Sequence, residues 1–129
     1  MIFGIGTDVV RLDRIEATYA RHGEHFVSRL LMPEEEAAFR LYKRPVRFLA
    51  MRFAAKEAIA KALGTGFAHG VWIRDMGIAA NSWGRPEVIW SERGRKVRDA
   101  LGAGEGHVTL TDEAGLVVAV AVLMRRERS

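Results

Sequence analysis

The sequence predicts an α+β fold, a single domain over residues 1–129 in which helices pack on a mainly antiparallel sheet. Three observations lead to this fold class. Helix-like segments gather in the first half of the chain, strand-like segments gather in the second half, and no linker or repeat separates the two halves. With 49% hydrophobic and 28% charged residues, the chain also has the composition of an ordinary globular domain.

The chain is predicted to open with a strand and a short helix. Residues 2–10 are rich in β-branched side chains and form the strand, although Gly4 and Gly6 loosen it. The helix that follows has Asp13 as its N-terminal cap and Gly23 as its stop.

Three more helices are predicted in the first half. Residues 24–31 form a short one. The next begins at Pro33 and carries three glutamates in its first turn, where the helix dipole favours acids. Pro45 then starts a long helix over residues 46–63, which Gly64 closes.

The second half is predicted to hold the remaining strands and one helix. Residues 71–81 and 86–90 are strand-like and are joined by NSWGR, which has the composition of a turn. Ser91 caps the helix that follows, and Gly94 weakens it. The turn DEAG separates the last two strands, residues 107–112 and 116–124.

The composition limits the classes of function. A net charge of +4 and a pI near 10.0 favour an acidic partner, which includes nucleic acid, anionic membranes, acidic proteins and phosphorylated small molecules. The lack of cysteine excludes disulfides, thiolate metal sites and cysteine nucleophiles. No apolar run is long enough for a membrane span, and MIFGIGTDVV does not resemble a signal peptide, so we expect a cytoplasmic protein.

The stretch RFAAKEAIAKALGTG carries an unusual charge pattern for a helix of small apolar residues. Glu57 and Lys61 stack four residues apart, in the favourable order for a surface ion pair, whereas Arg52 and Lys56 form a separate basic pair. Two like charges at this spacing repel one another unless an anion lies between them. The pattern therefore leaves open a plain solvated face or a ligand site beside the glycines of Gly64–Gly66.

A second carboxylate, Asp8, ends the first strand in GIGTD, beside glycines that leave room for a ligand. Two carboxylates with phosphate oxygens and waters are a usual way of holding Mg²⁺. An aspartate at the end of a strand is also typical of turns and caps. The spacing alone leaves open whether Asp8 and Glu57 meet.

Four segments together resemble the holo-acyl-carrier-protein synthases, the small phosphopantetheinyl transferases. They are GIGTDVVRLDRI (4–15), PVRFLAMRFAAKEAIAKALGTG (45–66), GRPEV (84–88) and HVTLTDEAG (107–115). The resemblance spans nearly the whole chain and includes its length and motif order. It implies the phosphopantetheinyl transferase fold and transfer of 4′-phosphopantetheine from coenzyme A to a serine of apo acyl carrier protein, which releases adenosine 3′,5′-bisphosphate and supports fatty acid biosynthesis.

The resemblance also implies the roles of individual residues. Asp8, Glu57 and Lys61 are expected to be catalytic, with the two carboxylates as Mg²⁺ ligands and the lysine on the same phosphates. In that family the incoming serine is deprotonated by the glutamate or by a metal-bound water. Arg52 and His107 are expected at the 3′-phosphate of coenzyme A. The full set of expected coenzyme A-binding residues is Arg52, Lys61, Gly64, Thr65, Gly66, Arg85, Pro86 and His107.

Simpler explanations exist for some of these positions. A lone histidine that opens a strand, such as His107, is usually just exposed, and Gly84-Arg85-Pro86 also fits a plain hairpin turn. Where many family members carry a second histidine, this chain has Asp112, so a contact that needs that histidine is in question. For the three tryptophans, packing is favoured over base stacking. They are Trp72, Trp83 and Trp90.

Arg14 and Arg21 lie on one face of the early helix, which by the resemblance docks an acidic helix of the carrier protein. A solvated charged face is the simpler explanation. We therefore expect coenzyme A and acidic apo acyl carrier protein as partners, and neither nucleic acid nor a membrane. The alternative function is a basic RNA- or nucleotide-binding module without catalysis, although the sequence has no RNP, KH or helix-turn-helix signature.

The last strand predicts association. Residues 116–124 are apolar at essentially every position, whereas a strand with one solvated face alternates. Either the helices of the same chain cover both faces, or a second copy covers one. By the resemblance we expect a homotrimer in which Asp8 and Glu57 come from one subunit and part of the coenzyme A pocket comes from the next.

Overall fold

The structure is a computed structural model, and it describes residues 1–127. Within these residues the chain forms one five-stranded sheet in the order β1-β5-β4-β3-β2, and all neighbouring strands are antiparallel. The predicted α+β fold is thus confirmed. The elements are β1 (Ile2–Arg11), α1 (Leu12–His22), α2 (Glu24–Leu30), α3 (Pro33–Leu41), α4 (Pro45–Leu63), η1 (Ile73–Asp75), β2 (Met76–Ala80), β3 (Pro86–Trp90), α5 (Glu92–Leu101), β4 (Ala103–Glu113) and β5 (Leu116–Arg125).

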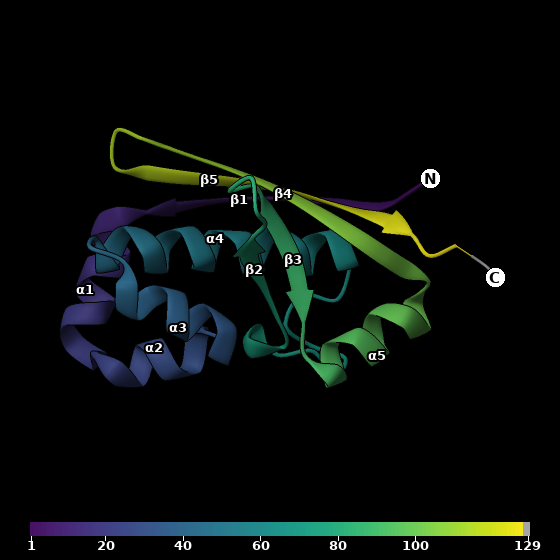
Figure 1. Cartoon of the computed structure of the whole chain (residues 1–129), viewed down its shortest axis with the longest axis horizontal. Helices are drawn as coiled ribbons and strands as arrows, with labels where there is room; N and C mark the ends of the chain where they lie inside the picture. The colour runs from purple at the N-terminus through teal and green to yellow at the C-terminus, as the bar shows by residue number, and fades with distance from the viewer. Residues whose placement is uncertain (128–129) are drawn as a thin grey trace.

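The helices lie on one side of the three long strands β1, β5 and β4 (Figure 1). The long helix α4 runs directly beneath these strands, and α1, α2 and α3 pack below it. On β5, alternate side chains point toward α4 and are fully buried, namely Val117, Ala119, Ala121 and Leu123. The predicted apolar face of α4 is also buried, namely Ala54, Ala55, Ala58, Ile59, Ala62 and Leu63. No helix within residues 1–127 is both long and apolar enough to cross a membrane.

The strand β1 and the helix α4 approach each other at backbone distance. A Cβ atom added at Gly4 would lie 1.9 Å from the carbonyl oxygen of Ala62, and one added at Gly6 would lie 2.0 Å from that of Ala58. The prediction that these glycines leave room for a ligand is therefore wrong, because the backbone of α4 fills that room. Their absent side chains instead allow the end of β1 to meet the middle of α4.

We expect Gly6→Ala to destabilise the protein by roughly 3 kcal/mol, the upper part of the range for overpacking, because the new methyl group meets rigid helix backbone. The free energy of unfolding from urea denaturation measures this loss. Gly104→Ala is the control, since its Cβ would lie 3.2 Å from its nearest neighbour, and it should cost less than about 1 kcal/mol. Equal stability of the two variants would show that α4 can move away from β1 at little cost.

Three predicted boundaries differ from the structure, and one of them is the strand predicted over residues 107–112, which begins at Ala103. Asp13 is not the cap of α1, because β1 runs directly into the helix and Arg11 occupies the N-cap position. Asp13 lies in the first turn and accepts a hydrogen bond of 2.6 Å from Arg11. The strand predicted over residues 71–81 begins only at Met76, because the carboxylate of Asp75 accepts a hydrogen bond from the backbone N–H of Trp72 and closes a 3-10 turn before it.

The predicted cap of α5 is confirmed, since the Ser91 hydroxyl accepts a hydrogen bond of 3.0 Å from the backbone N–H of Gly94. Gly94 itself has a packing role that the sequence did not suggest. A Cβ at this position would lie 2.2 Å from the carbonyl oxygen of Asp75. The glycine therefore lets α5 pack against the turn that precedes β2.

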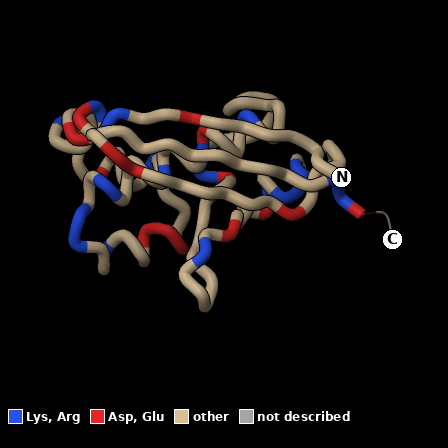
Figure 2. The backbone as a smooth tube through the Cα atoms, turned by 90° about the horizontal axis from the view of Figure 1, so that it is seen from above, with Lys and Arg blue, Asp and Glu red and all other residues tan. Residues whose placement is uncertain are grey.

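The second face of the long strands is uncovered within residues 1–127. Val118, Val120 and Val122 of β5 point to this face, opposite the buried residues of the same strand. On the neighbouring strand β1, Ile5 and Val9 are each 59% exposed. Figure 2 looks onto this outer face and shows that charged residues are sparse along its strands. The alternative that helices of the same chain cover both faces is thus excluded for the part of the chain described.

Candidate functional site

The contact between β1 and α4 brings two carboxylates into one cavity. Asp8, near the end of β1, and Glu57, in the middle of α4, both line a cavity of about 430 Å³. Burial raises the pKa of Glu57 above its ordinary value, the negative charge of Asp8 raises it further, and Lys61 opposes both effects. Asp8 and Glu57 therefore lie close enough to interact, which their spacing in the sequence had left open.

Lys61 contacts Asp8 rather than Glu57. Its ammonium group donates a hydrogen bond of 2.9 Å to the carbonyl oxygen of Thr7 and lies 3.2 Å from Oδ1 of Asp8. The Lys61 side chain is 53% exposed, whereas that of Asp8 is only 16% exposed. Lys61 therefore forms its ion pair with Asp8 and not with Glu57, the partner that the helix spacing suggested. Its ammonium group also remains accessible to a ligand.

The donor set suits a hard cation that is shared with a substrate. No group of three or more histidine, aspartate or glutamate side chains among residues 1–127 could hold a metal ion. Asp8 and Glu57 alone supply carboxylate oxygens in a partly buried cavity. Mg²⁺ is commonly held by one or two carboxylates and completes its shell with substrate phosphates and water. The pair fits that ion only in company with a phosphorylated ligand.

The basic face of α1 begins at the rim of this cavity. Arg14 and Thr18 line the cavity together with Asp8 and Glu57, and Arg14 is exposed. Arg21 is also exposed, two turns farther along α1. An acidic partner bound on this face would therefore lie next to the two carboxylates.

Four of the eight residues predicted to bind coenzyme A line other cavities. Arg52 and Pro86 line a second cavity of about 450 Å³ between α4, the end of α3 and the β2–β3 hairpin. Arg85, Pro86 and His107 line a third cavity of about 260 Å³. His107 also lies 3.3 Å from Glu105. None of these residues lines the cavity that holds Asp8 and Glu57.

The predicted glycine turn follows α4 directly. Gly64 adopts φ of 86° and Gly66 adopts φ of 58°, a backbone region that favours glycine. The N–H groups of both glycines donate to the carbonyl oxygen of Ala60 and so close the helix. The hydroxyl of Thr65 donates to the carbonyl oxygen of Gly66. This turn lies one helical turn beyond Lys61.

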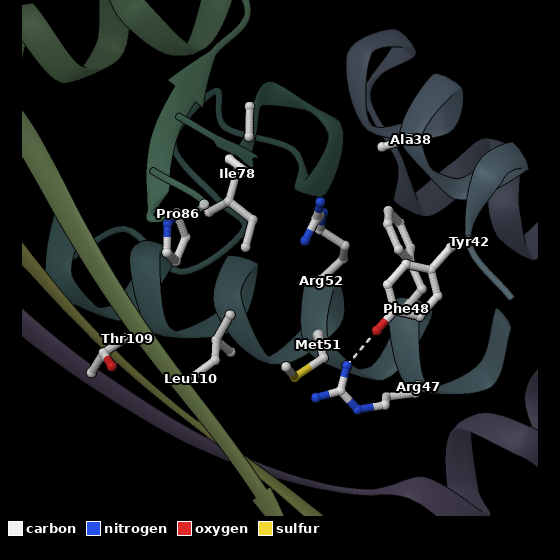
Figure 3. Close-up of a pocket in the computed structure, with 13 residues that line it drawn as sticks. Ala38, Tyr42, Arg47, Phe48, Met51, Arg52, Ile78, Pro86, Thr109 and Leu110 are labelled. Carbon is white, nitrogen blue, oxygen red and sulfur yellow. Dashed lines mark hydrogen bonds between the residues drawn. The ribbon is translucent and has the colours of Figure 1, made fainter. Parts of the chain in front are cut away.

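The second cavity has a largely apolar wall and two basic side chains (Figure 3). Arg47 is fixed by Asp112, which accepts hydrogen bonds of 3.0 Å from its Nε and Nη2 atoms. Arg47 also donates to the hydroxyl of Tyr42, as the dashed line in Figure 3 marks. Asp112 thus anchors an arginine at the cavity wall.

The anion between the two basic residues of α4 is a carboxylate of the protein itself. Glu35 of α3 is 1% exposed, and its Oε1 atom lies 2.5 Å from the ammonium group of Lys56. Its Oε2 atom lies 3.2 Å from Nε of Arg52. Glu35 also accepts hydrogen bonds from the backbone N–H groups of Met32 and Ile78. From the sequence, Glu35 was predicted only to lie in the first turn of its helix, and its role between the two cations was not predicted.

The tryptophans divide into two kinds. Trp90 is half-buried and packs against the core, as expected. Trp83 is 92% exposed at the β2–β3 hairpin and Trp72 is 61% exposed, so neither side chain packs in the core of residues 1–127.

Comparison with known proteins gives one consistent family. Residues 4–121 match the model of the 4′-phosphopantetheinyl transferase superfamily. The holo-[acyl-carrier-protein] synthase of Halorhodospira halophila is 44% identical over 124 residues, which cover 96% of this chain and 98% of that protein. The enzyme of the same name from Vibrio cholerae is 41% identical and covers 98% of this chain and 100% of its own.

Solved structures agree with these sequence relatives. The crystal structure of holo-[acyl-carrier-protein] synthase from Neisseria meningitidis superposes with a TM-score of 0.92 at 40% identity, and covers 97% of this chain and 100% of that one. The Helicobacter pylori synthase, solved in complex with coenzyme A, has a TM-score of 0.80 at 29% identity, and the match covers 92% of this chain and 98% of that one.

Proposed function

Because the chain belongs to the 4′-phosphopantetheinyl transferase superfamily, and within it to the holo-[acyl-carrier-protein] synthases, we propose that it transfers phosphopantetheine from coenzyme A to a serine of apo acyl carrier protein. The serine oxygen bonds to the phosphorus that carries pantetheine, the bond from that phosphorus to the bridging oxygen breaks, and adenosine 3′,5′-bisphosphate leaves. We assign this reaction to the cytoplasm and to fatty acid biosynthesis. The observation that carries the proposal is the pair of carboxylates in one cavity, Asp8 and Glu57.

Asp8 and Glu57 are proposed to hold Mg²⁺ together with the pyrophosphate of coenzyme A. When bound, the ion would neutralise charge on the transferred phosphoryl group and on the leaving group. Lys61, which already contacts Asp8, would orient that carboxylate and meet the same phosphates. Glu57 lines the same cavity and is proposed as the general base that takes the proton of the serine hydroxyl.

The coenzyme is proposed to lie between two subunits of a homotrimer. The cavity with Asp8 and Glu57 and the cavities with Arg52 and His107 are separate within one chain. The uncovered apolar face of β1 and β5 offers the surface on which a second copy would pack. Packing there would let the carboxylates of one subunit share a ligand with the adenosine-side residues of the next.

Mass spectrometry tests the proposed reaction. Apo acyl carrier protein incubated with coenzyme A, Mg²⁺ and the protein should gain the mass of phosphopantetheine, and this gain should need all three components. An RNA- or nucleotide-binding module would leave the carrier unmodified, which would overturn the proposal. Addition of a chelator should stop the mass gain if the metal assignment holds.

Reversal of two charges on α1 should weaken carrier binding. In Arg14→Glu combined with Arg21→Glu, attraction to an acidic helix becomes repulsion, so the KM for the carrier should rise roughly tenfold or more while coenzyme A binding is unchanged. Wild-type association should also slow as salt rises. Arg95→Glu with Lys96→Glu on α5 reverses two exposed charges elsewhere and is the control. An unchanged KM in the α1 variant would remove this helix from the docking surface.

A further inference from the structure

The charges around Glu35 do not balance. One carboxylate contacts two cations, Lys56 and Arg52, so the three groups together carry one surplus positive charge. All three side chains are largely or fully removed from water, with 0% exposure for Glu35 and Lys56 and 15% for Arg52. A surplus charge in such surroundings is costly unless an anion joins the group.

The two cations share Glu35 unequally. Lys56 has used its three N–H donors, because it contacts Glu35 at 2.5 Å and donates to the carbonyl oxygens of Met76 at 2.8 Å and Ile73 at 3.3 Å. Arg52 lies 3.2 Å from Glu35 through its Nε atom, and this buried atom has no well-formed hydrogen bond to any of residues 1–127. Glu35 is therefore neutralised chiefly by Lys56.

Arg52 remains directed toward the second cavity. Its guanidinium lies 4.3 Å from the centre of the Phe48 ring, and its side chain lines the cavity. Figure 3 shows Arg52 between Ile78 on one side and Phe48 with Tyr42 on the other. A cation stacked on a ring and short of hydrogen-bond acceptors is well prepared to bind an anion.

We propose that Lys56 is a positioning residue for anion binding: it neutralises Glu35 and so leaves the charge of Arg52 available to an anion in the second cavity. This inference rests on the proposed function and on the expected place of the 3′-phosphate of coenzyme A at Arg52. Lys56 sets the affinity for the coenzyme without touching it. Without Lys56, the carboxylate of Glu35 draws Arg52 toward itself and repels an incoming phosphate.

The affinities for coenzyme A and for 3′-dephospho-coenzyme A, measured by titration calorimetry, test this role. In Lys56→Met, coenzyme A should bind about tenfold more weakly, the loss expected for one charge-assisted hydrogen bond, while 3′-dephospho-coenzyme A should bind as to the wild type. In Glu35→Gln combined with Lys56→Met, no carboxylate competes for Arg52. The affinity for coenzyme A should then return to within about threefold of the wild-type value, although Lys56 is still absent.

A matched control separates this effect from loss of stability. Asp75→Asn damages another buried carboxylate, which accepts hydrogen bonds from Ser91 and Arg93, and it should lower thermal stability without changing the ratio of the two affinities. If Lys56→Met does not fold, Lys56→Gln replaces it, since its amide can still donate a hydrogen bond. An unchanged affinity ratio in the folded Lys56 variant, or no recovery in the double variant, would overturn the proposal. If the wild-type protein binds coenzyme A no more tightly than 3′-dephospho-coenzyme A, the assignment of the 3′-phosphate to Arg52 is overturned instead.

Discussion

Asp8→Ala and Glu57→Ala are each expected to lower phosphopantetheine transfer by at least about 10²–10³-fold, the range for losing a group that stabilises transition-state charge. Neither change should unfold the protein. Burial already disfavours the charged form of Glu57, and alanine is the best helix former at its position in α4. Loss of Asp8 frees Lys61, whose side chain is 53% exposed and can be hydrated.

Transfer to the carrier, followed by mass spectrometry at saturating and at limiting Mg²⁺, measures this prediction, and circular dichroism checks the fold. Glu92→Ala is the control, because Glu92 is an exposed carboxylate on α5 that pairs with Lys96. It should transfer at the wild-type rate. Normal turnover of Glu57→Ala at limiting Mg²⁺ would contradict the metal assignment and leave the carboxylate pair without a catalytic role.

The part of the site that lies on one helix was predictable from sequence. The helical spacing of the apolar residues identified the buried alanine face of α4. The spacing of the charged residues separated Glu57 from the basic pair, Arg52 and Lys56. The pairing of Asp8 with Glu57 was also encoded, because Gly4, Gly6 and Asp8 alternate along β1 and so share one face. Had the glycines been interpreted as a contact for helix backbone, this alternation would have directed Asp8 toward α4.

Glu35 could not be identified in this way. It stands between two other glutamates in the first turn of α3, and composition does not tell which of the three turns inward. Which glutamate is buried depends on how α3 packs against α4 and β2. There, Lys56 and the backbone N–H group of Ile78 both contact the carboxylate of Glu35. Only tertiary contacts separate this buried glutamate from its exposed neighbour Glu34.

For the last strand, β5, the sequence likewise did not show which face is buried. Every residue of 116–124 is apolar, so hydrophobicity did not tell which alternate set points inward. The structure places the small side chains of Ala119 and Ala121 on the face toward α4, where little space remains, and turns the larger Val118 and Val120 outward. On the outer face, Val120 lies between Thr7 of β1 and Thr109 of β4. Exposed apolar side chains that gather on one face are typical of an interface between protein copies.

Val118→Asp or Val120→Asp is therefore expected to dissociate the proposed homotrimer and to abolish activity at the same time. In a single chain each valine is only half-buried, so the new carboxylate can reach water and the monomer should stay folded. In the assembly, three copies of the carboxylate would be buried close together without partners, which costs several kcal/mol per interface. Light scattering at the assay concentration, alongside the transfer assay, measures both effects. Leu101→Asp, a similar change at an exposed position on α5, should leave size and activity unaltered. A fully active monomer would refute both the trimer and a site shared between subunits, because the carboxylates and Arg52 would then have to serve one coenzyme within one chain.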